Sequence, residues 1–195
     1  MRFQAGILAL WAAAAVLPTA LWAADTPAAR EIDAQKSVMT VRVFKTGLFS
    51  ALGHDHEITA PIREGKFSES GRSVDLIVDA RRMRVNDKDV SDKDRAEIQA
   101  TMLGPKVLDS EQFPEIRFHS TAVEPAGDGW AVRGDLTVHG QTRPVELQVK
   151  AQNGHYQGVA ELKQRDFGIE PISVGGGAVK VKNELRVEFD IVAKP

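Results

Sequence analysis

The stretch GDLTVHGQTRPVELQV, residues 134–149, contains the pattern that decides the fold. Apolar and polar residues alternate before Gly140, and they alternate again from Val145 to Val149. Side chains on a strand point alternately to its two faces, so each half has one apolar face and one polar face. Gly140 allows the positive backbone angle of a tight turn, and Pro144 suits the first residue of a returning strand. The stretch therefore predicts a β-hairpin in a sheet with an apolar interior.

The first 23 residues have the pattern of a secretory signal peptide. Arg2 precedes an apolar run at residues 7–17, Pro18 ends the run, and the segment at 20–24 offers small alanines for cleavage. The run is too short to favour a membrane span. We therefore expect residues 1–23 to be removed on export, and an uncleaved N-terminal anchor is the less favoured alternative.

The remaining residues are expected to form one exported domain, with an N-terminal lead-in at 24–36 and a β-barrel domain at 37–195. The sequence has no cysteine, so its core rather than disulfides must hold it together, and thiolate metal sites are excluded. The formal net charge of −2 argues against nucleic acid as the partner, because such proteins present a basic face. A bacterial periplasm is the favoured compartment, and full secretion is the alternative.

Short alternating segments separated by turn residues continue through the domain, which is typical of an antiparallel sheet. The period changes after Ser91, where residues 92–103 predict a short helix that ends at Gly104-Pro105. No second helical pattern exists to form another layer, so we expect this helix to act as a plug or flap on the sheet. Together with the loop at 47–53, it would gate entry to the interior.

The last strand favours a barrel over a sandwich. Alternation continues through residues 179–193, and a straight strand of about 15 residues would span roughly 50 Å. A closed, coiled sheet accommodates this length and removes exposed edges. The sequence therefore predicts an all-β fold with one short helix, an antiparallel β-barrel of about eight strands enclosing an apolar lumen.

The inward-facing residues are apolar and many are only valine-sized, which favours a lumen that binds a ligand over a filled one. The candidate ligand-binding residues are Met39, Val41, Val43, Leu76, Val78, Phe118, Trp130, Leu136, Val138, Leu147, Tyr156, Leu185, Val187 and Phe189. A filled barrel that serves as a stress-related interaction module is kept as an alternative.

Two strings in this sequence carry a resemblance to a known family: FPEIRFHST at 113–121 and GDLTVHGQTRPV at 134–145. They follow ID at 32–33 and precede RDFGI at 165–169. In this order they resemble the YceI family of lipid- or polyisoprenoid-binding proteins, which have a lipocalin-like barrel. The resemblance implies an exported carrier for a long isoprenoid or fatty-acid-like chain, without catalysis and without a cofactor. Such a carrier would exchange its ligand during transient contact with a membrane, and the oligomeric state stays open.

His54-Asp55-His56 is the strongest candidate for a metal site. On a strand the two imidazoles would share one face with Cα atoms about 7 Å apart, which can hold one metal ion. A catalytic zinc needs a third protein ligand, and the following Ala60 and Pro61 offer none. We therefore favour polar contacts that close a loop at the barrel rim. A metal-binding protein or metal-dependent enzyme that uses His54 and His56 is the alternative.

Arg81, Arg82 and Arg84 form a basic cluster at the end of a predicted strand. If the ligand carries a phosphate head group, these residues would meet it at the mouth of the barrel by charge pairing. Asp87 and Asp89 follow closely, and mixed charges are the ordinary pattern of a surface. A solvated loop is therefore the favoured interpretation. The chain also lacks the Gly-x-Ser-x-Gly turn of serine hydrolases, and no catalytic residue is predicted.

Overall fold

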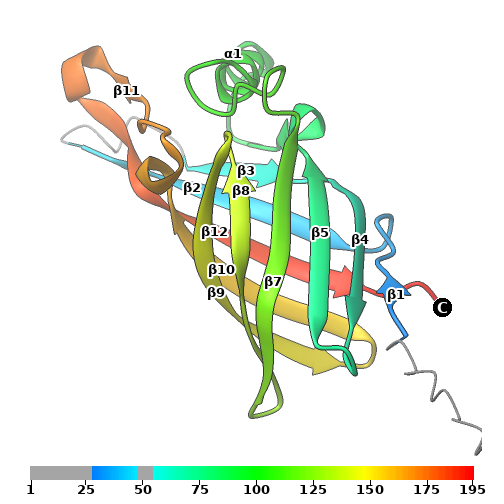
Figure 1. Ribbon diagram of the computed structural model, residues 1–195. Coiled ribbons are helices and arrows are strands. Elements are labelled where there is room, and N and C mark those ends of the chain that lie inside the picture. The colour runs from blue at the N-terminus through cyan, green and yellow to red at the C-terminus, as the bar shows by residue number, and fades with distance from the viewer. Residues whose placement is uncertain (1–27, 48–54) are drawn as a thin grey trace, which may run out of the picture.

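The computed structural model describes residues 28–47 and 55–195, and within them one antiparallel sheet curls around an interior (Figure 1). The predicted signal peptide (1–23), the predicted gating loop beyond Gly47 and His54 lie outside the described residues. The sheet consists of β1 (Arg30–Glu31), β2 (Val38–Thr46), β3 (His56–Thr59), β4 (Ile62–Ser68), β5 (Ser73–Asp79), β6 (Arg84–Val85), β7 (Glu115–Ala126), β8 (Gly129–Val138), β9 (Gln141–Gln152), β10 (His155–Lys163), β11 (Ser173–Val174) and β12 (Val179–Val192). The helical segments are α1 (Asp92–Leu103) and the 3-10 turns η2 (Ala80–Arg82), η3 (Gln164–Phe167) and η4 (Gly175–Gly177).

The strand order is β1-β4-β5-β7-β8-β9-β10-β12-β2-β3-β6, and β11 pairs with the start of β12. β3 and β4 lie near opposite ends of this order, yet only Ala60 and Pro61 separate them in the chain. The Ala60 amide donates to the Met39 carbonyl on β2 at 2.9 Å, and the Asp79 amide of β5 donates to the Pro61 carbonyl at 3.1 Å. This link brings the two ends of the sheet together. The predicted all-β, antiparallel, curled architecture is confirmed.

β1 and the residue after it link β4, at one end of the sheet, to the end of β12. The β1 residues pair with β4, and the next residue, Ile32, forms a bridge with Ala193 beyond the end of β12. The Ile32 amide also donates to the Gly65 carbonyl on β4 at 2.8 Å. Residues 30–32 are thus part of the sheet, which begins before residue 37, the expected start of the domain.

The hairpin at 134–149 forms as a tight turn between β8 and β9. His139 and Gly140 are its two central residues, with φ of 49° and 71°, as a type I′ turn requires. Pro144 is not the first residue of the returning strand but its fourth, and it pairs with Asp135. Counted from the turn, this pair is of the type that makes no cross-strand hydrogen bonds. The missing N–H of Pro144 therefore points toward the side on which this part of β9 has no strand partner.

The single α-helix of the described chain, α1, covers one end of the curled sheet (Figure 1). Ser91 caps it by accepting a hydrogen bond from the Asp94 amide, and the helix stops at Gly104, as the sequence predicts. Met102 is the buried residue of the helix. In the described part of the chain, no helix is long and apolar enough to cross a membrane.

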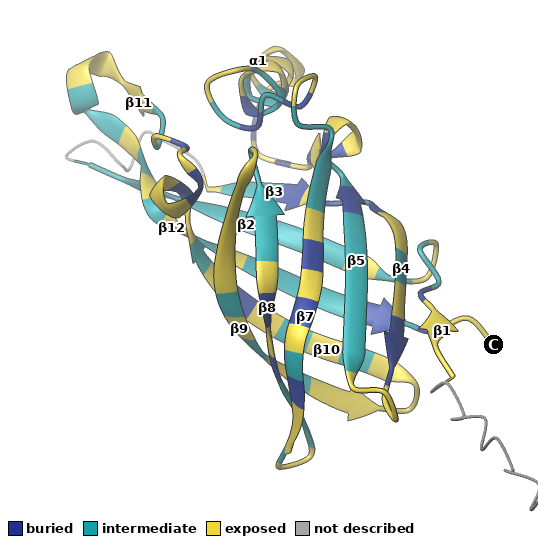
Figure 2. Cartoon of the chain, in the orientation of Figure 1, coloured by how far each residue is buried: buried dark blue, intermediate teal, exposed yellow. Residues whose placement is uncertain are grey.

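Burial alternates along the strands, as Figure 2 shows most clearly for β7. β12 is 14 residues long and alternates through its first half. Its pairing with β2 shifts between Val181 and Leu185, next to the polar Asn183. Such a bulge increases the local bend of a strand, which fits a long strand that follows a curled sheet.

Candidate functional site

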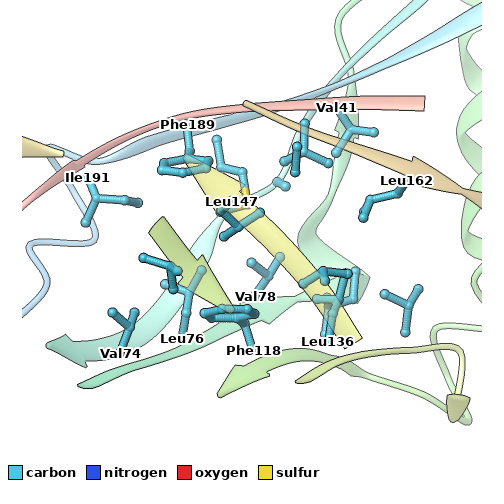
Figure 3. Close-up of a pocket in the computed structure, with 18 of the residues that line it drawn as sticks. Val41, Val74, Leu76, Val78, Phe118, Leu136, Leu147, Leu162, Phe189 and Ile191 are labelled. Atoms are coloured by element: carbon cyan, nitrogen blue, oxygen red, sulfur yellow. The ribbon is translucent and has the colours of Figure 1, made fainter. Parts of the chain in front are cut away.

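A cavity of about 270 Å³ lies inside the curled sheet. Every residue that the alternation predicted for the lumen lines it, from Met39 on β2 to Phe189 on β12. In Figure 3 the labelled side chains extend from facing walls toward a shared space. The described lining is apolar apart from the polar ends of a few side chains: Ser68, Glu69, Ser73, Tyr156, Lys163 and Gln164.

Two phenylalanines of the wall pack against glycines. Gly158 pairs with Phe189 across β10 and β12, and a Cβ built on Gly158 would lie 2.5 Å from the Phe189 ring. A Cβ on Gly134 would likewise lie 2.5 Å from the Phe118 ring. Each ring therefore occupies the space that a side chain would take on the neighbouring strand. This arrangement holds two large rings close to the backbone of the wall.

At the α1 end, the cavity is covered by buried apolar side chains from segments between the strands. These are Met83, Met102, Leu108, Phe167 and Ile169, each less than a tenth exposed. Strand alternation could not identify them, because they lie outside the long strands. Met102 was indicated by the apolar side of the predicted helix, and Phe167 lies within the RDFGI string.

The covering residues of η3 fill a gap in the wall. β9 and β10 pair only between Gln148–Gln152 and His155–Val159, so the two strands separate toward the α1 end. η3 follows directly on β10 and contacts both β9 and β12. Gln164 anchors it by donating to the Lys182 carbonyl at 2.7 Å. The apolar Phe167 is thereby placed over the part of the cavity that the sheet leaves uncovered.

The opposite end of the cavity carries a polar pair. The Tyr156 hydroxyl of β10 donates a hydrogen bond to Glu69, which lies in the turn between β4 and β5. The Tyr156 ring packs edge-on against Phe67 with ring centroids 4.6 Å apart. Arg30 lies over the other ring of this contact, 5.9 Å from the Phe67 centroid. The strand alternation predicted Tyr156 for the lumen but not Glu69, because a turn residue has no place in a strand pattern.

Burial, the hydrogen bond to Glu69 and the negative charge of Glu69 together raise the pKa of the Tyr156 hydroxyl to about 12. Arg30 acts in the opposite direction and lowers this pKa. The hydroxyl therefore keeps its proton at neutral pH and uses it in the bond to Glu69. A phenol held in this way is a structural donor rather than a proton-transfer group.

The predicted head-group residues lie near the α1 end but do not line the cavity. Arg81, Arg82 and Arg84 are exposed on η2 and β6. The Arg84 guanidinium donates to the carbonyls of Arg81 and Met83 at 3.1 and 2.8 Å, and Arg81 lies 3.8 Å from Asp79. The structure thus groups the three arginines on the outer surface, apart from the cavity.

His56 belongs to a polar hollow of about 460 Å³ outside the barrel. Its Nδ1 lies 2.6 Å from a carboxylate oxygen of the buried Asp87, whose other oxygen accepts the Glu57 amide at 2.8 Å. Arg95 of α1 donates to the Asp87 carbonyl at 2.6 Å. These contacts tie β3 to the loop before α1. Within residues 28–47 and 55–195, no group of three acidic or histidine side chains could hold a metal ion.

The remaining described histidines also have partners of their own. His119 Nδ1 lies 2.6 Å from Asp75, and His155 Nδ1 lies 2.8 Å from Asp190. His139 Nδ1 lies 3.3 Å from the Phe167 carbonyl. None of them approaches His56 to complete a metal site among the described residues.

Curated proteins with similar sequences align with about half of this chain. A UPF0312 protein of Vibrio cholerae serotype O1 is 32% identical over 108 residues, which cover 50% of this chain and 56% of that protein. A UPF0312 protein of Yersinia pestis is 34% identical over 107 residues, which cover 50% and 55% of the two chains. The similarity thus spans a little over half of the length of these relatives.

Solved structures show the same fold. The crystal structure of BcnA from Burkholderia cenocepacia matches 84% of this chain and 99% of its own, with a TM-score of 0.61 and 22% identity. A Campylobacter jejuni YceI protein matches 71% of this chain and 81% of its own, with a TM-score of 0.50 and 10% identity. The sequence profile of the YceI-like domain matches residues 31–193. This match confirms the resemblance seen in the two sequence strings, and the chain belongs to the YceI-like family.

Proposed function

We propose that this protein binds a long apolar ligand, a polyisoprenoid or a fatty-acid-like lipid, inside its barrel and carries or sequesters it. The observation that carries the proposal is the cavity of about 270 Å³ with apolar walls on all the strands that surround it. The YceI-like family is known for binding proteins with a barrel. Membership supports a binding function, and the nature of the ligand is our inference from the lining.

Burial supplies the binding energy. Water finds few hydrogen-bond partners in such an apolar space. An apolar cavity of about 150 Å³ can stay dry and bind benzene. Each CH₂ group that leaves water contributes about 0.8 kcal/mol, offset by the cost of ordering a flexible chain. The described lining is almost wholly apolar, and we propose binding without catalysis and without a cofactor.

We further propose that the carrier acts after export, in the periplasm or outside the cell, and that residues 1–23 direct it there. Ligand exchange would then occur during transient contact with a membrane. Expression of the full chain in a bacterial host, followed by mass measurement of the periplasmic fraction, tests this. Loss of a segment that ends near residue 23 is expected, and an intact chain in the cytoplasm would contradict export.

The binding function is tested with N-phenyl-1-naphthylamine, a neutral dye whose fluorescence rises in apolar surroundings. Leu147 points into the cavity, whereas the next residue, Gln148, is exposed on the outer face of β9. We expect Leu147→Trp to fill the lumen and abolish dye uptake, while Gln148→Trp binds the dye as the wild type does. If the wild type takes up no dye and native mass spectrometry detects no co-purified lipid, the proposal fails.

A further inference from the structure

The polar groups of the cavity are concentrated at two places along β10. Tyr156 lies near the start of this strand, beside Glu69, and Lys163 ends it. Seven residues of strand separate them by roughly 23 Å. Lys163 is the one cationic side chain among the described lining residues, and Glu69 is the one anionic side chain. An amphipathic ligand can therefore place its head group at an acidic end or at a basic one.

The acidic end is organised by specific contacts. Tyr156 is held by its ring contact with Phe67 and by its hydrogen bond to Glu69. Ser68 lines the same end, and its hydroxyl oxygen accepts the Gly71 amide at 2.9 Å, which orders the turn that carries Glu69. No comparable contact of the Lys163 ammonium exists among the described residues. The Glu69 end is thus the better-defined recognition site.

The groups left available at this end are hydrogen-bond acceptors. The single proton of the Tyr156 hydroxyl is committed to one oxygen of Glu69. The second Glu69 oxygen and the tyrosine lone pair that the Arg30 side chain does not use remain, and both accept hydrogen bonds. A head group that donates a hydrogen bond, such as the hydroxyl of an alcohol or a phenol, satisfies them.

A phosphate or carboxylate head group does not fit this end. At neutral pH a carboxylate has no proton to offer and a phosphate monoester has mostly lost its second proton. Either group would bring a further negative charge next to Glu69. Like charges placed together at a binding site are strongly unfavourable. Arg30 is the nearby cation and interacts with the Tyr156 hydroxyl, but it does not line the cavity. Its guanidinium also lies over Phe67 and donates to the Lys194 carbonyl at 3.5 Å.

We propose that Glu69 and Tyr156 form the head-group site of the cavity and select ligands that end in a neutral hydrogen-bond donor over the same chain ending in an anion. This inference rests on the proposed binding of a long apolar ligand. The apolar chain extends from Glu69 toward the buried side chains at the α1 end. The head group lies at the end of the barrel opposite to Arg81, Arg82 and Arg84.

The test compares two ligands with the same tail, geranylgeraniol and geranylgeranyl monophosphate, by displacement of N-phenyl-1-naphthylamine. We expect the wild type to bind the alcohol at least about tenfold more tightly than the phosphate. Glu69→Gln should reduce this preference to within about threefold, because the charge is lost while an acceptor remains. Glu69→Lys should reverse it. Glu69 is an exposed turn residue, so these variants are expected to fold, and thermal unfolding confirms it.

Glu161→Gln is the matched control, because Glu161 lies on β10 with its side chain exposed outside the cavity. It should keep the wild-type preference. The inference is overturned if the wild type prefers the phosphate, or if Glu69→Lys leaves the ratio of the two affinities unchanged. A preference for the phosphate that disappears in Lys163→Gln would place the head group at the other end. If neither lipid displaces the dye and the dye itself does not bind, the proposed function fails instead.

Discussion

The two ends of this barrel are completed by different kinds of residue. At the α1 end, buried apolar side chains from three separate segments cover the cavity, with Met102 and Phe167 among them. At the other end, the turn between β4 and β5 and the start of β10 bring together a carboxylate and a phenol at the cavity. One end buries apolar area, which stabilises a fold. The other end exposes hydrogen-bonding groups to the lumen, which can distinguish ligands.

This difference separates stability from recognition along the length of one cavity. Substitutions at the α1 end should change the free energy of unfolding, because the side chains there are almost fully buried. Substitutions of the polar pair should change which ligand binds, with small effects on folding.

The largest effect is expected for Phe167→Ala. Phe167 is 4% exposed and packs in the cluster that includes Met83 and Ile169. Removing a buried phenylalanine ring usually costs about 3–5 kcal/mol of unfolding free energy, and urea denaturation measures this. Val38→Ala is the control, since Val38 is 57% exposed, and it should change stability by less than about 0.5 kcal/mol. A loss below about 1 kcal/mol for Phe167→Ala would show that η3 is not part of the stabilising core.

Gly158→Ala tests the wall between the two ends. The added methyl group would overlap the Phe189 ring and the Gln148 carbonyl, and overpacking of this kind typically costs about 1–3 kcal/mol. In a Phe189→Leu background the ring is gone, so Gly158→Ala should lower the free energy of unfolding by less than it does in the wild type. A double-mutant cycle measured by urea unfolding gives this coupling. Equal costs in the two backgrounds would contradict the contact between the ring and Gly158.

The sequence predicted the walls of this site well because strand alternation is a local property. Residues such as Leu136 and Phe189 face the lumen since every second side chain of a strand points the same way. The same reasoning identified the helix at 92–103 from its capping residue and its stop. The family strings then connected these elements to a barrel with a cavity.

The ends of the barrel could not be predicted in this way. Phe167 and Met83 reach the cavity from irregular segments, which have no period to follow. Glu69 and Tyr156 are 87 residues apart in the chain, and their contact exists only after the sheet has curled. Pro144 shows a further limit, because a proline fits inside β9 only where β10 does not pair with that strand.

The titration of Tyr156 can be followed directly, because it is the single tyrosine of the chain. Absorbance at the phenolate band should give a midpoint of about 12 for the folded protein and about 10 in denaturant. Because folding raises this pKa, the stabilisation associated with the protonated hydroxyl is complete below the unfolded value. It is lost as the pH rises through the folded value.

Glu69→Gln separates the causes of this shift. Burial, the largest cause, stays in the variant, while the negative charge of Glu69 is removed. The midpoint should therefore fall below the wild-type value but remain above that of the unfolded chain. A folded wild-type midpoint near 10 would show that the hydroxyl is neither buried nor bonded to Glu69.

The smallest effect is expected for the double substitution Arg81→Gln with Arg82→Gln. Both side chains are exposed and neither lines the cavity, and surface changes of this kind usually alter stability by less than about 0.5 kcal/mol. The affinity for geranylgeranyl monophosphate should change by less than about twofold, since an exposed charge outside the cavity is screened by solvent and salt. Displacement titrations at low and at physiological salt measure this affinity. A large, salt-sensitive loss would assign the phosphate to the α1 end, and recognition would then occur at the end of the barrel that we assign to stability.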